Sequence, residues 1–126
     1  MRTERAAIGE ARRHPFLDDL ADDVELVSSA LRGTVQGRDA VRSVVEALAR
    51  HYTAQMPWFL DDGGGMRSYV DFDLVLPDDR RGRGLVAIQR DPAGEVMGLN
   101  ITFSPMDVVL VIGAAMRDDG GAGRAR

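Results

Sequence analysis

The sequence contains no cysteine and no lysine, few aromatic residues and no long hydrophobic run. The absence of cysteine excludes disulfide bonds, thiolate metal ligands and cysteine nucleophiles. No apolar stretch is long enough to span a membrane, and no apolar segment follows the basic start MRTER. We therefore expect a soluble, unexported, cytoplasmic protein without a membrane partner. The 16 basic residues are all arginine and are scattered among 20 acidic residues, which argues against a nucleic-acid partner.

The length of 126 residues suits one domain with one hydrophobic core. The sequence shows neither an internal repeat nor an internal linker. Its polar start and its glycine-rich end, DDGGAGRAR, are expected to be flexible. We therefore expect a single domain over residues 1–126, with a core at about 14–117 and flexible ends at 1–12 and 118–126.

The first half of the core alternates between helical and extended patterns. Pro15 suits the first position of a short helix that ends near Ala21 to Asp23, where the β-branched run VELVSSA predicts a strand. From Arg38 to about Tyr52, apolar residues recur at helical spacing with charged residues opposite them. This half therefore predicts a short helix, a strand and a long amphipathic helix.

The second half is dominated by strand signals. QMPWFL predicts one strand, and residues 66–76 alternate apolar with polar side chains, as a half-buried antiparallel strand does. GLVAIQR and EVMGLNITF flank the turn DPAG and predict a hairpin. A serine and a proline open residues 105–117, which we expect to form a helix that is apolar almost all round. The whole pattern predicts an α+β domain with helices on one face of a curved antiparallel sheet.

Four motifs follow one another between about His14 and Arg117: FLDDLADDVEL, QGRDAVRSVVEAL, RDPAGEVMGLNITF and SPMDVVL. In this order and spacing, they resemble the nuclear transport factor 2-like superfamily, and within it the SnoaL-like and ketosteroid-isomerase-like branch. The resemblance implies a cystatin-like α+β fold, in which a curved antiparallel sheet forms a cone and the helices pack on its concave face.

The acidic residues of ADDV fall where, in that family, a helix gives way to the first strand. We expect Asp22 and Asp23 to shape this turn by bonding backbone amides rather than to perform chemistry. The spacing of Asp18, Asp19, Asp22 and Asp23 does not match an oxygen-ligand calcium loop. The sequence therefore predicts no metal site, and nothing in it indicates a cofactor.

The isomerase of this family uses an aspartate base, with a tyrosine and a protonated aspartic acid as oxyanion donors. Alignment through the motifs places Ser28 at the position of the base and Val86 at that of the second acid. The segment before FLDDLADD contains no tyrosine. Serine without a partner base cannot shuttle a proton at neutral pH, and valine donates nothing, so steroid isomerase activity is not expected.

The resemblance also implies a cavity between the concave face of the sheet and the long helix. Its implied lining is apolar, although plain core packing is the more common role of such residues: Val70, Phe72, Leu74, Val86, Ile88, Met97, Leu99, Ile101 and Phe103. The candidate polar groups for a ligand are Tyr52, Gln55 and Trp58, near the end of the long helix. The one candidate general base is His51, which has no evident carboxylate partner in the sequence.

Three functions remain open, because fold alone does not rank them. The domain could bind a small hydrophobic ligand without catalysis. It could instead be a cyclase, isomerase or hydrolase acting on a polyketide-like or other hydrophobic molecule, or a structural dimeric module whose cavity is filled by side chains. Surplus apolar surface at Val75, Leu85 and Ala87 and on the helix from Pro105 further predicts a homodimer.

Overall fold

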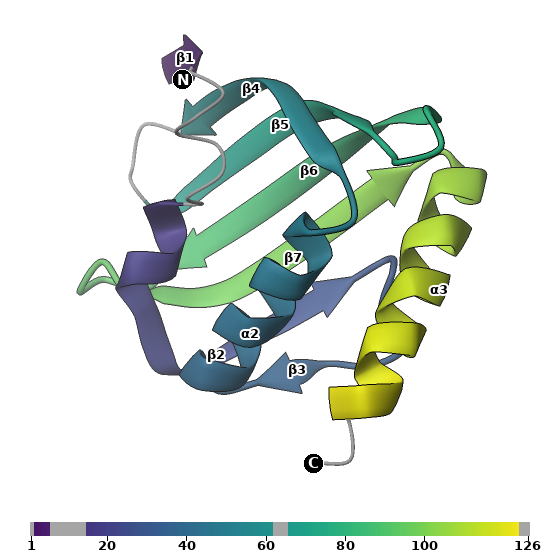
Figure 1. Ribbon diagram of the computed structural model, residues 1–126. Coiled ribbons are helices and arrows are strands. Elements are labelled where there is room, and N and C mark those ends of the chain that lie inside the picture. Colours follow the sequence, from purple (N-terminus) through teal and green to yellow (C-terminus); the bar gives the residue numbers. More distant parts are fainter. Residues whose placement is uncertain (1, 6–14, 62–65, 124–126) are drawn as a thin grey trace.

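A computed structural model describes residues 2–5, 15–61 and 66–123. Its elements in chain order are β1 (Arg2–Arg5), the 3-10 helix η1 (Pro15–Asp19), β2 (Leu20–Ser28), β3 (Val35–Gln36), α2 (Arg38–Ala49), β4 (Thr53–Asp61), β5 (Arg67–Val75), β6 (Arg81–Arg90), β7 (Val96–Ser104) and α3 (Met106–Gly123). The strands form one curved sheet, with α2 lying across it and α3 beside α2 (Figure 1). This is the predicted α+β architecture of a curved sheet covered by helices.

The sheet has seven strands in the order β1-β4-β5-β6-β7-β2-β3. Every neighbouring pair is antiparallel except β2 and β7, which run parallel. The sheet was predicted to be antiparallel, and the pairing of β2 with β7 departs from that prediction. Because α2 and four further strands separate β2 from β7 along the chain, the connection is long enough for a parallel crossover.

The core lies between the inner face of the sheet and the two α-helices. Helix α2 buries Val41, Val45 and Leu48, whose spacing places them on one face. Helix α3 adds Val108 and Ile112, both fully buried. The apolar circumference of α3, from which an intersubunit contact was expected, is therefore partly covered within the chain. No helix in the described ranges is long and apolar enough to span a membrane.

Three differences from the expected elements concern weakly patterned segments. β1 lies in a segment that was expected to be flexible and pairs with β4, and the short β3 pairs with β2. Helix α3 continues to Gly123 instead of ending near residue 117, despite its glycines. Helix propensity is a weak determinant beside tertiary packing. The remaining residues of the two ends lie outside the described ones.

Asp22 and Asp23 lie inside β2 rather than in a turn before it. The register between β2 and β7 shifts between Leu20 and Glu25, and this irregularity accommodates both aspartates. Asp22 forms an ion pair with Arg38 of α2, whose Nε donates a hydrogen bond to the Leu20 carbonyl at 3.1 Å. The acidic stretch thus connects β2 to the start of α2 through an ion pair, and not through the expected backbone cap.

Candidate functional site

An aromatic cluster of Tyr52, Phe72 and Phe103 lies on the inner face of the sheet, just beyond the C-terminal end of α2. The Tyr52 ring stacks on Phe72 and meets Phe103 edge-on, each with 5.5 Å between ring centroids. Phe72 and Phe103 flank Gly84 in register on neighbouring strands. A Cβ atom at Gly84 would overlap the Phe72 ring, so the absence of a side chain there makes room for the cluster.

The Tyr52 hydroxyl is a polar group in these apolar surroundings. It has no hydrogen-bond partner among the residues that the structure describes. Burial raises the pKa of the phenol, so the hydroxyl stays protonated and able to donate at neutral pH. Since no polar or charged residue of the described chain is fully buried in the core, the inner face offers a donor without a neighbouring buried acid.

The predicted lining residues on β5, β6 and β7 all lie on the inner face of the sheet, with one exception on β7 described below. The following are buried there: Val70, Phe72, Leu74, Val86, Ile88, Leu99, Ile101 and Phe103. All of them belong to one core cluster with residues of α2 and α3. Burial suits both core packing and the wall of a ligand site, so contact with a ligand stays a prediction.

Trp58 and Met97 lie on the outer face, away from the aromatic cluster. The four residues of β4 from Gln55 to Trp58 lie opposite three residues of β5, from Asp73 to Asp71. This extra residue makes Trp58 the cross-strand partner of the outward-facing Asp71. A one-residue bulge reverses which side chains face inward. A second shift leaves Met97 unpaired on β7, with 43% of its surface exposed. Neither residue joins the inner face, where both were predicted to lie.

The two positions aligned with the isomerase acids lack acid chemistry in the structure as well. The Ser28 hydroxyl accepts a hydrogen bond from the Ala30 amide at 3.2 Å, which engages it in a turn. Val86 lies 1% exposed on the inner face, among apolar side chains. Neither side chain carries a carboxyl group.

His51 has a carboxylate partner that the sequence did not reveal. Its Nε2 atom lies 2.7 Å from Oδ2 of Asp119 on α3, a residue 68 positions away in the chain. Such a pair can fix the orientation of an imidazole ring. The second ring nitrogen, Nδ1, takes no part in the contact with Asp119. Only the packing of α3 beside the end of α2 brings the two residues together, so no local motif could have identified them.

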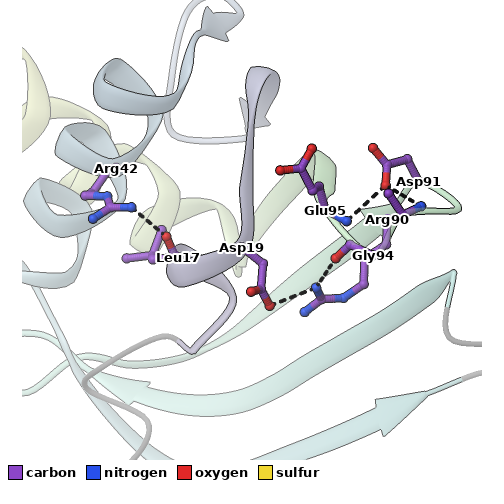
Figure 2. Close-up of polar contacts among 8 residues, drawn as sticks. Leu17, Asp19, Arg42, Arg90, Asp91, Gly94 and Glu95 are labelled. Carbon is purple, nitrogen blue, oxygen red and sulfur yellow. Dashed lines mark hydrogen bonds and ion pairs between the residues drawn. The ribbon is translucent and has the colours of Figure 1, made fainter.

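A polar depression of about 360 Å³ lies between η1, the first turns of α2 and the β6–β7 turn. Arg42 donates from Nη2 to the Leu17 carbonyl at 2.8 Å, and Arg90 bonds both Asp19 and the Gly94 carbonyl (Figure 2). The Nε of Arg42 is buried without a partner. These contacts hold η1 against α2 and against the hairpin turn. We therefore assign Arg42 and Arg90 a structural role.

The histidine and acidic side chains of the described chain form no group of three or more that could hold a metal ion. The geometry therefore presents two features with chemical potential. One is the aromatic cluster with its free donor, and the other is the His51–Asp119 pair.

No family model matches the sequence. No curated protein matches it either. Among solved structures, a steroid delta-isomerase from Pseudomonas aeruginosa superposes with a TM-score of 0.74 at 15% identity, over 96% of this chain and 97% of that one.

Two further structures agree with this likeness. An uncharacterized protein with a cystatin-like fold from Silicibacter pomeroyi gives a TM-score of 0.72 at 17% identity, over 90% of this chain and 79% of that one. A protein described as a SnoaL-like polyketide cyclase from Jannaschia gives 0.56 at 12% identity, over 81% and 78%. The chain thus has the cystatin-like α+β fold that these solved structures share, and the predicted fold class is confirmed.

Proposed function

We propose that the protein binds a small hydrophobic molecule against the inner face of the cone, and that it lacks ketosteroid isomerase chemistry. The observation that carries the proposal is Tyr52, whose ring packs against the apolar rings of Phe72 and Phe103 while its hydroxyl has no hydrogen-bond partner among the described residues. Ligand sites of this kind combine a mostly apolar wall with a few polar groups that set orientation. A ligand bearing one acceptor oxygen, such as a ketone, suits this arrangement.

The ligand should be detectable on the purified protein. We expect native mass spectrometry to show a non-protein mass, and fluorescence titration with small cyclic ketones to give saturable binding. Replacing Tyr52 with phenylalanine should weaken ketone binding about tenfold, since one hydrogen bond is lost, but leave hydrocarbon binding unchanged. Tyr69→Phe is the matched control, because Tyr69 pairs with the outward-facing Ala87. If no hydrophobic compound binds, or both variants behave alike, the proposal fails.

Steroid isomerase activity should be absent. The reaction needs a base to remove a proton and an acid to stabilise the oxyanion. Ser28 and Val86 supply neither. A β,γ-unsaturated ketosteroid should therefore convert at the buffer rate when mixed with the protein. Conversion well above that rate, abolished in Tyr52→Phe, would contradict this half of the proposal without affecting ligand binding.

A second candidate function is catalysis on a polyketide-like or other hydrophobic molecule, with His51 as general base. The observation that favours it is the carboxylate partner, with Asp119 Oδ2 at 2.7 Å from the imidazole. Turnover that is lost in His51→Gln while ligand binding persists would favour this enzyme. Absence of any ligand from a stable dimer would favour the structural module instead.

A further inference from the structure

Three charged side chains in the polar depression between η1, α2 and the β6–β7 turn have no counter-ion. Asp18 of η1, Arg42 of α2 and Glu95, just before β7, all line this depression of about 360 Å³. None of the three forms an ion pair with any residue that the structure describes. They come from three separate elements, so only the tertiary structure brings them to one place.

The other charged residues that line the depression are already compensated. Arg38 forms an ion pair with Asp22 of β2. Asp19 forms another with Arg90 of β6, whose Nη1 lies 3.0 Å from the carboxylate. The depression therefore presents two negative charges and one positive charge that no partner within the described chain neutralises.

The guanidinium of Arg42 is half-buried and uses little of its capacity for hydrogen bonds. Its Nη2 donates to the Leu17 carbonyl at 2.8 Å, whereas its Nε is buried without an acceptor. Removing a charged group from water is unfavourable unless a counter-ion or hydrogen bonds compensate it. A planar guanidinium suits a carboxylate in particular, because the two can share parallel hydrogen bonds. The structural bond to Leu17 thus leaves Arg42 able to hold a carboxylate.

Asp18 and Glu95 suit ammonium groups better than a metal ion. The histidine and acidic side chains in the described ranges form no group of three or more that could hold a metal. The Glu95 main-chain amide donates to Asp91 at 2.9 Å, but its carboxylate bonds to no described residue (Figure 2). The Asp18 carboxylate is likewise exposed and unbonded in the part of the chain that the structure describes. An ammonium group carries three donors and can satisfy such acceptors.

We propose that this depression binds a basic amino acid of the lysine or ornithine type, which carries one carboxylate and two ammonium groups. The ligand carboxylate lies against Arg42, and the ammonium groups lie against Asp18 and Glu95. This ligand neutralises all three uncompensated charges, and complementary charges of this kind confer specificity. Ala93, which also lines the depression, leaves room for the aliphatic chain. The inference is independent of the proposed hydrophobic ligand, because no residue of the aromatic cluster lines the depression.

Calorimetric titration with free lysine tests the site, at low ionic strength because salt screens exposed charges. We expect saturable binding of lysine to the full-length protein. Norleucine lacks the side-chain ammonium group and cadaverine lacks the carboxylate, so each should bind at least about tenfold more weakly than lysine. Glutamate, whose second charge has the opposite sign, should not bind.

Variants assign each charge of the site to one group of the ligand. Asp18→Asn and Glu95→Gln should each weaken lysine binding about tenfold, because one charged contact is lost. Arg42→Gln should weaken lysine binding to a similar extent but leave cadaverine binding unchanged, since cadaverine has no carboxylate to hold. Glu46→Gln, on an exposed residue of α2 outside the depression, is the matched control that should bind lysine like the wild type.

Several results would overturn the proposal: no binding of lysine, equal binding of lysine, norleucine and cadaverine, or site variants that bind lysine like the wild type. An equal loss in Glu46→Gln would also overturn it, because the attraction would then come from overall charge and not from this site. Circular dichroism of every variant checks folding. If Arg42→Gln loosens η1 through the lost bond to Leu17, the variants of Asp18 and Glu95 still decide the outcome, since neither carboxylate bonds to the described chain.

Discussion

Replacing Ile112 with aspartate is expected to unfold the protein. Ile112 is fully buried in α3 and packs in the same core cluster as residues of α2 and the sheet. A carboxylate there would lose its hydration without gaining a partner, and the isoleucine packing would also be lost. We expect a loss of about 4 kcal/mol or more, which is comparable to the whole stability of many domains.

The measurement is urea unfolding followed by circular dichroism, with soluble yield as a second readout. Leu110→Asp is the matched control, because Leu110 lies two positions earlier on the same helix and is 63% exposed. Its effect should stay within about 0.5 kcal/mol. A folded but dissociated Ile112→Asp protein would mean that this side of α3 lies between subunits, which is the alternative that the sequence had suggested.

Adding a methyl group at Gly84 is expected to disrupt the aromatic cluster. The new Cβ atom would overlap the ring of Phe72, which cannot move freely while it stacks on Tyr52. Overpacking of a dense core typically destabilises by about 1–3 kcal/mol, and we expect Gly84→Ala to fall in this range. Gly33→Ala, where nothing lies within 4 Å of the added atom, should be close to neutral.

A double-mutant cycle with Phe72→Leu identifies the cause. If the ring of Phe72 is what the new methyl group meets, the loss from Gly84→Ala should shrink in the Phe72→Leu background, and the two effects should not add. Chemical denaturation measures all four proteins under one condition. A neutral Gly84→Ala would show that the ring lies elsewhere, and the geometry behind the ligand proposal would lose its basis.

Part of the candidate site was predictable from the sequence, because successive side chains of a strand point to opposite faces of the sheet. The buried residues Val70, Phe72 and Val86 followed from this period, and the structure places them on the inner face. Trp58 and Met97 did not follow, since the bulges before them change the face that a side chain occupies. A bulge leaves no clear mark in composition, so its position had to come from strand pairing.

The sequence by itself determined the α+β class, the amphipathic helix α2, the strands β4 to β7 and the hairpin, because hydrophobic period and turn residues act locally. Through the family resemblance, it also predicted that Ser28 and Val86 stand where the isomerase carries acids. Only the tertiary structure decided the parallel pairing of β2 with β7, the burial of α3 and the meeting of His51 with Asp119. Each of these joins segments that are distant in the chain. Their contact depends on how whole elements pack, and no local pattern encodes that packing.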